Sequence, residues 1–249
     1  MSLGTSSIFS TMREKIFRFK QFTVSNDKSA MKVGTDGVLL GAWCSATNAL
    51  RVLDVGTGTG LIALMVAQRN ESAIIEAVEI DEDACMEAEL NFNESRWSDR
   101  LTAVRDNFID FAQRCNVRYD LIVSNPPFYT EDILPSGLQR KQARHCSSLS
   151  YKELIESSLK ILGDDGIISF ISPVSRERDI QAVIDENNLH IIRRLTIYPK
   201  PGADAKRIIW EISRMEKTTT DFSLTIEHLG RHEYTDEYIA LTKAFYLNM

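Results

Sequence analysis

The residues best suited to chemistry lie in the segment Ser124 to Phe128, which reads Ser-Asn-Pro-Pro-Phe. The apolar run before it, which begins at Tyr119, is typical of a buried strand. A proline cannot donate to a sheet ladder, and it keeps the residue before it out of the helical region. We therefore expect the strand to end at a rigid, extended loop that carries Asn125. In open α/β sheets ligands bind at the carboxyl ends of the strands, so this loop is a candidate ligand site.

The loop offers two hydrogen-bond acceptors beside an aromatic plane. The side-chain oxygen of Asn125 and the carbonyl of Pro126 can accept from an amine, and Phe128 can stack on a flat ring. This combination fits a planar ring with an exocyclic amine. Asn-Pro pairs also occur in ordinary turns, so the loop taken alone leaves a turn without chemistry as an alternative.

A glycine-rich turn upstream favours the ligand site. The apolar strand 51–55 runs into Gly56-Thr57-Gly58-Thr59-Gly60, and an apolar helix follows over 61–68. Such a turn lets a ligand approach the backbone at a helix N-terminus. A dinucleotide fingerprint would need a glycine where Leu61 stands, and the loop lacks the lysine of a Walker motif. With Asp54 in front, the pattern D-x-G-x-G-x-G resembles the S-adenosylmethionine loop of class I methyltransferases.

Acidic residues follow the next two expected strands. Glu79 ends the strand 74–79, about 20 residues beyond the glycine loop, where a carboxylate can accept from both hydroxyls of a ribose. The alternative is a surface acid within an acidic stretch. Asp106 comes just after the strand 101–105, where it can accept from the adenine amine of a cofactor. Its alternative role is to cap a short helix that starts near Asn107.

Strands and helices alternate along the whole chain. We expect strands at 51–55, 74–79, 101–105, 119–124, 166–171, 191–198 and 207–213, and helices at 38–43 with Asp36 as the cap, 61–68, 83–92, 151–162 and 176–187. The last two strands are joined by a short turn without room for a helix, so they pair antiparallel. The pattern predicts an α/β fold with a doubly wound, mostly parallel seven-stranded sheet and a C-terminal antiparallel hairpin. A flexible N-terminus, 1–15, would precede a single domain, 16–249.

Composition indicates an ordinary globular protein of 249 residues, with 43% hydrophobic and 26% charged residues. We see neither a secretory signal nor an apolar run of about 18 residues, so we expect no membrane partner and a cytoplasmic location. The four cysteines are widely spaced, which argues against a metal site or a disulfide framework. The net charge of −6 does not indicate nucleic-acid binding, but basic residues cluster within 12–34 and 140–145. These clusters are either solvated faces or contacts for RNA phosphates.

Five segments of the chain together carry a resemblance to a known family: Phe19 to Val24, Met31 to Trp43, Leu53 to Gln68, Val78 to Asp81 and Ser124 to Phe128. In this order they resemble the bacterial tRNA(Val) adenine-37 N6-methyltransferase family. The segments Lys-Gln-Phe and Lys-Val-Gly-Thr-Asp-Gly are much more specific than the glycine loop. The resemblance implies transfer of a methyl group from S-adenosylmethionine to the adenine next to the anticodon of a valine tRNA.

The resemblance also implies roles for individual residues. The cofactor would be held by Asp54, Gly56, Gly58, Gly60, Glu79 and Asp106, and its methionine end would be lined by Lys20, Gln21, Phe22 and Thr35. Asn125, Pro126 and Phe128 would hold the target base, with Asn125 also beside the cofactor. Related amino-methylating motifs often end in tyrosine, and N-P-P-F also resembles guanine-N2 methyltransferases of ribosomal RNA. A guanine of ribosomal RNA, a protein glutamine amide and a non-catalytic RNA-binding module therefore stay open as alternatives.

Overall fold

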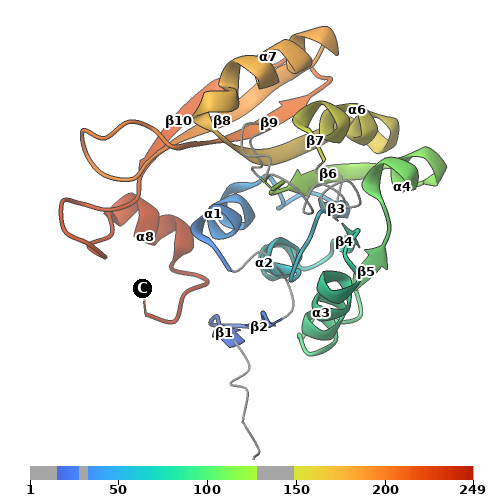
Figure 1. Ribbon diagram of the computed structural model, residues 1–249, viewed down its shortest axis with the longest axis horizontal. Coiled ribbons are helices and arrows are strands. Elements are labelled where there is room, and N and C mark those ends of the chain that lie inside the picture. The colour runs from blue at the N-terminus through green and yellow to red at the C-terminus, as the bar shows by residue number, and fades with distance from the viewer. Residues whose placement is uncertain (1–15, 28–32, 128–148, 249) are drawn as a thin grey trace, which may run out of the picture.

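The computed structural model describes residues 16–27, 33–127 and 149–248 (Figure 1). The expected flexible N-terminus 1–15, Phe128 and the basic cluster 140–145 lie outside the described residues. One sheet has the strand order β10-β8-β9-β7-β6-β3-β4-β5. Its strands are β3 (Arg51–Val55), β4 (Ile74–Glu79), β5 (Leu101–Arg105), β6 (Tyr119–Ser124), β7 (Leu162–Pro173), β8 (His190–Tyr198), β9 (Arg207–Ser213) and β10 (Thr220–Thr225).

The sheet confirms the expected doubly wound architecture. Strands β7, β6, β3, β4 and β5 are parallel, and β9 pairs antiparallel with both β7 and β8. The C-terminal hairpin is therefore present as expected. An eighth strand, β10, adds parallel to β8 at the edge. The sequence pattern did not reveal β10 because only Leu224 of this edge strand is buried.

Helices cover both faces of the sheet (Figure 1). They are α1 (Thr35–Trp43), α2 (Leu61–Arg69), α3 (Glu82–Asn93), α4 (Phe108–Arg114), α6 (Tyr151–Ile161), α7 (Glu177–Glu186) and α8 (Asp236–Thr242), with a 3-10 turn at Val174–Arg176. Side chains of α1, α2, α3 and α8 share one buried cluster, and those of α4, α6 and α7 share a second. Within the described ranges, we find no helix with the length and apolarity that a membrane span requires.

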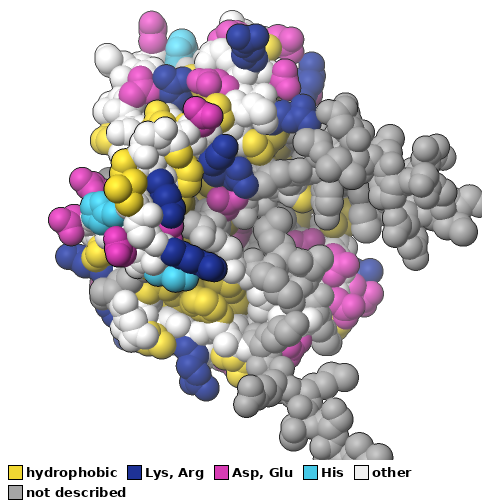
Figure 2. Space-filling model, turned by 60° about the vertical axis from the view of Figure 1, so that its left-hand side comes forward, with side chains coloured by type: hydrophobic (Ala, Val, Ile, Leu, Met, Phe, Trp, Pro, Cys, Tyr) yellow, Lys and Arg dark blue, Asp and Glu magenta, His cyan; other side chains and the backbone are white. Residues whose placement is uncertain are grey.

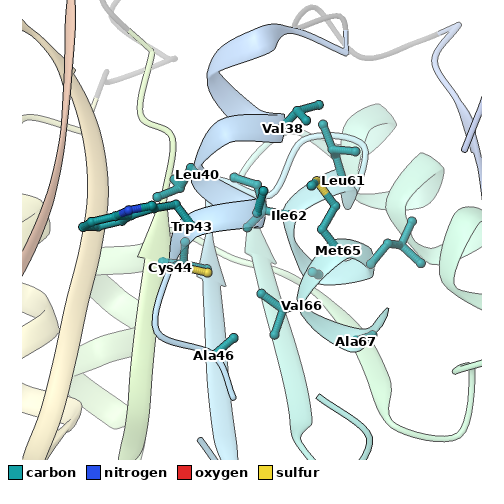
Figure 3. Close-up of a cluster of buried hydrophobic side chains, with 14 of the residues drawn as sticks. Val38, Leu40, Trp43, Cys44, Ala46, Leu61, Ile62, Met65, Val66 and Ala67 are labelled. Atoms are coloured by element: carbon teal, nitrogen blue, oxygen red, sulfur yellow. The ribbon is translucent and has the colours of Figure 1, made fainter. Parts of the chain in front are cut away.

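Helices α1 and α2 pack closely because a glycine lies between them. A Cβ atom on Gly41 would come within 2.8 Å of the sulfur of Met65. Figure 3 shows Met65 and Ile62 of α2 in the cluster that α1 also enters with Leu40. The two helices also lie close where they begin, at Gly37 and Leu61.

The start of α1 differs from the sequence prediction. We expected Asp36 to cap the helix, but the N-cap is Gly34 and Asp36 lies in the first turn. The Asp36 carboxylate instead accepts a hydrogen bond from Nε of Arg207 at 2.8 Å. The prediction was wrong because an acid in the first turn and an acid at the N-cap give the same sequence signal.

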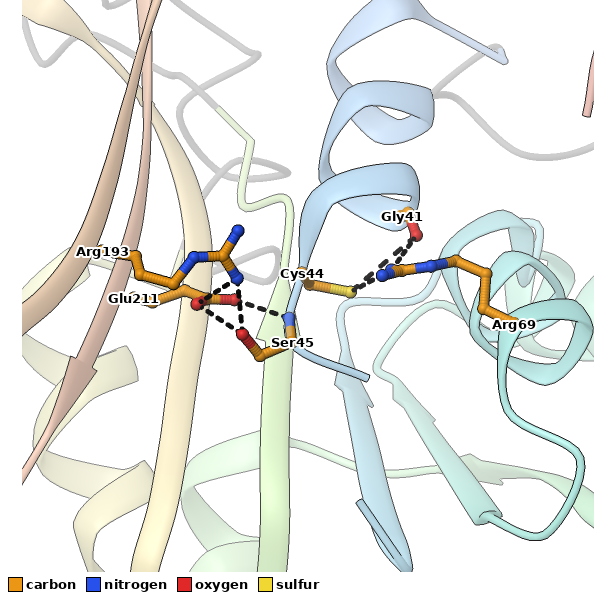
Figure 4. A network of polar contacts seen from close by, with 6 residues as sticks. All are labelled: Gly41, Cys44, Ser45, Arg69, Arg193 and Glu211. Carbon is orange, nitrogen blue, oxygen red and sulfur yellow. Dashed lines mark hydrogen bonds and ion pairs between the residues drawn. The ribbon is translucent and has the colours of Figure 1, made fainter. Parts of the chain in front are cut away.

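The end of α1 is held by a buried polar network (Figure 4). Glu211 of β9 is fully buried and accepts from the Ser45 amide at 2.6 Å and from its hydroxyl at 2.7 Å. Arg193 of β8 pairs with the same carboxylate at 3.0 Å and lies 4.0 Å from the ring centre of Trp43. Burial raises the pKa of Glu211, and Arg193 opposes that rise. The network anchors α1 on the sheet and so positions its other end.

Candidate active site

Four neighbouring parallel strands bring most of the predicted residues to one edge. Ser124 lies opposite Val55, Val55 opposite Val78, and Glu79 opposite Arg105. The strands β6, β3, β4 and β5 therefore end at the same level. Asn125, Gly56, Glu79 and Asp106 follow or end these strands, so the structure gathers them along the carboxyl edge of the sheet.

The glycines of the loop are required for different structural reasons. All have positive φ angles, 66° at Gly56, 57° at Gly58 and 80° at Gly60, where other residues are strained. A Cβ atom on Gly56 would have no described atom within 4 Å, so this side of the loop is open. A Cβ on Gly60 would meet the Phe92 ring of α3 at 2.4 Å. Gly60 is thus needed for packing, and Gly56 leaves room for a ligand.

Asp54 lies beneath the glycine loop and is fully buried. Its Oδ2 accepts from the Thr57 hydroxyl at 2.6 Å and from the Ala63 amide at 3.1 Å. Burial raises the pKa of Asp54 to about 7, although both hydrogen bonds lower it. Its Oδ1 has no hydrogen-bond partner among the described residues. Asp54 therefore ties the loop to the first turn of α2, and its contacts in the structure are those of a positioning residue.

The Glu79 carboxylate is oriented by two backbone amides. Its Oε2 accepts from Gly58 at 2.9 Å and its Oε1 from Asp81 at 3.0 Å. Each carboxylate oxygen keeps a further lone pair, so Glu79 can still accept from two hydroxyls. The residue is 9% exposed, unlike an acid on the open surface. The neighbouring Asp81 instead caps α3 by accepting from Ala84 at 2.9 Å.

Asp106 lies beside Glu79 at the end of β5. Its amide donates to the Glu79 carbonyl at 2.9 Å, and its Oδ2 pairs with the guanidinium of Arg114. The alternative role as a helix cap is wrong, because Asn107 caps α4 by accepting from Ile109 at 2.9 Å. Oδ1 takes no part in this ion pair and can accept from a ligand.

Asn125 lies where α1 and α2 both begin. A Cβ atom on Gly37 would come 3.2 Å from Cδ2 of Leu61 and 3.9 Å from Nδ2 of Asn125. Pro126 is buried, and Thr35 is exposed on the first turn of α1. The structure therefore brings Asn125, Pro126 and the first turn of α1 together. Phe128 lies outside the described residues.

The predicted residues Lys20, Gln21 and Phe22 belong to a two-stranded hairpin, β1 (Ile16–Arg18) and β2 (Thr23–Ser25). We call residues 16–27 the arm. Phe22 is 6% exposed and stacks on Phe19 with ring centres 4.6 Å apart, so it is a packing residue. Lys20 donates to the carbonyl of Lys243 at 2.6 Å, and Gln21 is exposed.

One residue that links the arm to the glycine loop was missed by sequence reasoning. Asn91 of α3 is 1% exposed; its Oδ1 accepts from the Ser25 amide at 2.8 Å. Its Nδ2 donates to the carbonyl of Ser25 at 3.1 Å and to that of Thr59 at 2.9 Å. A polar residue on the apolar face of the predicted helix 83–92 was the only sequence signal for this bridge.

Basic side chains do not form a separate patch on the face drawn in Figure 2, and metal ligands do not gather among the described residues. Figure 2 shows the side of the molecule that carries α8, where basic side chains lie among acidic and apolar ones. In the ranges that the structure describes, no three His, Cys, Asp or Glu side chains gather as a metal site would require. Cys44, Cys85 and Cys115 are free thiols. The described part of the site is thus built from glycines, carboxylates and amides.

The sequence matches the family model of the methyltransferase small domain over residues 29–172. The tRNA1(Val) (adenine(37)-N6)-methyltransferase of Flavobacterium psychrophilum is 45% identical over 94% of this chain and 100% of its own length. The enzyme of the same name from Trichodesmium erythraeum is 44% identical over 93% of this chain and 97% of its own.

Solved structures share the fold at low sequence identity. A protein from Agrobacterium tumefaciens described as a predicted O-methyltransferase has a TM-score of 0.68 and 20% identity, covering 84% of this chain and 96% of its own. The M. jannaschii tRNA m1G37 methyltransferase has a TM-score of 0.55 and 14% identity, covering 81% of this chain and 57% of its own. At these identities the likeness concerns the fold alone.

A doubly wound sheet with a glycine loop after β3 and an acid at the end of β4 defines the class of protein: a class I methyltransferase that uses S-adenosylmethionine. The relatives identify the family within this class, because the sequence identity to them extends over nearly the whole of both chains. The chain belongs to the tRNA1(Val) (adenine(37)-N6)-methyltransferase family.

Proposed function

We propose that this chain transfers a methyl group from S-adenosylmethionine to the N6 amine of adenine 37 in tRNA(Val). The names of relatives that are 41–45% identical support this target. The observation that carries the proposal is the position of Asn125 and Pro126, which directly follow β6 beside the glycine loop and the first turn of α1. Two acceptors for one amine thus lie next to the cofactor loop.

The residues at the edge of the sheet fit the cofactor. The open side of Gly56 leaves room for it, and the two remaining lone pairs of Glu79 suit the ribose hydroxyls. We assign the adenine amine to Oδ1 of Asp106 and give Gly58 the role of orienting Glu79. Asp54 and Gly60 act through the shape of the loop. Lys20, Gln21 and Thr35 would face the methionine end, with Phe22 packing behind them.

The chain's own task is to position and polarise the target amine. When bound, S-adenosylmethionine supplies a methyl group that is already activated for transfer. An adenine amine is a poor nucleophile because its lone pair is spread into the ring. Hydrogen bonds from the amine to Oδ1 of Asn125 and to the Pro126 carbonyl favour a pyramidal nitrogen with its lone pair directed away from both. Because positive charge develops on this nitrogen, the two acceptors stabilise the transition state electrostatically.

An anticodon loop is a suitable substrate for this site. The target base must leave its stack, which costs a few kcal/mol and less in a loop than in a duplex. Stacking on Phe128 would return roughly 1 to 3 kcal/mol. A tRNA substrate also supports a cytoplasmic location for the reaction. Residues 16–249 would act as one domain, supported by the arm and the C-terminal residues, which share one buried cluster with α1 and α2.

The test is methylation of an unmodified tRNA(Val) transcript with labelled S-adenosylmethionine, followed by nucleoside analysis. We expect N6-methyladenosine at position 37, and no transfer to a matched transcript with guanine at that position. Methylation of a guanine in ribosomal RNA, or of a glutamine-containing peptide, in place of tRNA would overturn the target. Binding of tRNA without any transfer would instead favour a non-catalytic RNA-binding module.

A further inference from the structure

We infer that the C-terminal segment Lys243 to Tyr246 is a positioning element of the cofactor site, because it holds the arm in place beside the glycine loop. The inference rests on the proposed function in one respect, namely that the arm faces the methionine end of the cofactor. The segment itself follows α8 and is far from the glycine loop in sequence. Its effect on the site is therefore indirect and passes through the arm.

Backbone and side-chain hydrogen bonds join the segment to the arm. The Lys20 amide donates to the Phe245 carbonyl at 2.7 Å, and the Lys20 ammonium donates to the Lys243 carbonyl at 2.6 Å. Phe19 and Tyr246 form an antiparallel bridge. The segment is in turn fixed on α2, where Nε2 of Gln68 donates to the carbonyl of Ala244 at 2.9 Å. The arm is thus attached to the body of the protein along its outer side.

Aromatic packing strengthens this attachment. The Tyr246 ring stacks on Phe19 with centres 5.8 Å apart and meets the edge of Phe17 at 6.2 Å. Phe19 in turn stacks on Phe22, whose ring lies 5.9 Å from that of Trp97. Such ring pairs contribute beyond their buried area. Tyr246 is therefore part of a group of rings that runs from the exposed Phe17 to the buried Trp97.

The inner side of the arm is held at the glycine loop itself. Asn91 bridges both backbone groups of Ser25 to the carbonyl of Thr59, as described above. The Asp27 amide also donates to Oε1 of Glu87, a second buried side chain of α3, at 2.6 Å. The arm has two anchors, the C-terminal segment and α3. Loss of either anchor should let the arm move relative to the glycine loop.

The effect should therefore fall on cofactor binding and leave the transfer step largely intact. We expect Tyr246→Ala to weaken binding of S-adenosylhomocysteine about tenfold and to raise the KM for the methyl donor similarly, with kcat within about twofold. Tyr246→Phe keeps the ring, so it should restore most of the affinity. Tryptophan fluorescence of the unliganded variant should shift to the red, because Trp97 loses the cover of Phe22.

Leu189→Ala is the matched control for general destabilisation. Leu189 is 5% exposed and belongs to the cluster on the opposite face of the sheet. It should lower Tm without changing the affinity for S-adenosylhomocysteine. If Tyr246→Ala lowers Tm but binds S-adenosylhomocysteine as tightly as Leu189→Ala does, the segment is merely structural and the inference is wrong.

A second variant tests the inner anchor in case Tyr246→Ala does not fold. Asn91→Asp keeps the shape and the acceptor for the Ser25 amide but loses both donated hydrogen bonds. It should weaken S-adenosylhomocysteine binding to a similar extent, and unchanged affinity would overturn the role of the arm. Because calorimetric binding requires no RNA, an error in the proposed tRNA target would leave this comparison decisive.

Discussion

The two halves of the site are held in different ways. The cofactor half, around the glycine loop, depends on hydrogen bonds among buried polar groups, chiefly those of Asp54 and Glu79. The base half is a short loop in which Pro126 and Pro127 themselves restrict the backbone that carries Asn125. Changes in the first half should therefore alter affinity and stability together. Changes at Asn125 should alter turnover alone.

Asn125→Ala should have the largest effect and tests this separation directly. Removing an acceptor for the developing charge should lower kcat roughly 10²–10³-fold or more. Affinity for S-adenosylhomocysteine should stay within a few-fold, because the glycine loop and Glu79 are intact. Single-turnover kinetics and calorimetry measure the two quantities. The exposed Asn93 at the end of α3 provides a matched control as Asn93→Ala, and a large loss of cofactor affinity in Asn125→Ala would break the comparison.

Glu79→Gln should show the opposite pattern. The amide keeps one acceptor oxygen, but charged hydrogen bonds are worth about 1.5 to 3 kcal/mol, so affinity for S-adenosylhomocysteine should fall by roughly 10- to 100-fold. At saturating cofactor, kcat should change little. Glu82→Gln removes the same charge from the exposed pair with Arg105 and is the control. Equal losses in both variants would mean that net charge, and not the position of Glu79, sets the affinity.

Gly56→Ala and Gly60→Ala should separate ligand space from packing within the loop. Both residues have positive φ, so each substitution strains the backbone by about 1 kcal/mol. At Gly60 the added Cβ also meets Phe92 at 2.4 Å, which should lower the free energy of unfolding by a further amount of about 1 to 3 kcal/mol. Urea denaturation should therefore show the greater loss for Gly60→Ala. Cofactor affinity, after correction for the fraction of unfolded protein, should fall more for Gly56→Ala.

The last prediction concerns a pH dependence of stability from Asp54. Burial raises its pKa from 3.8 to about 7, so the folded chain keeps a proton that the unfolded chain releases. The contribution of Asp54 to stability is greatest below about pH 4 and is lost as the pH rises to about 7. The free energy of unfolding of the unmodified chain, relative to that of Asp54→Asn, should thus decrease as the pH rises from about 4 to about 7. Urea titrations at several pH values measure this difference, and a constant difference would contradict the assignment.

Local sequence patterns identified most of the fold. The glycine loop, Glu79 and the loop at Asn125 follow apolar strands, and each lies where its strand ends. The pattern failed where elements are short or exposed, as at β10 and at α8, which has seven residues. It also placed Asp36 at the cap, because its partner Arg207 is far away in sequence.

The sequence by itself therefore determined the class of fold and the identity of the residues at the edge of the sheet, because these depend on short-range periodicity and on turns, whereas the strand order came from the structure. Only the tertiary structure decided which groups hold those residues in place. Asn91 reaches Ser25 across 66 positions, and Lys20 reaches Lys243 across 223. Such contacts leave no local pattern, since they form only when packing of the apolar faces brings distant segments together.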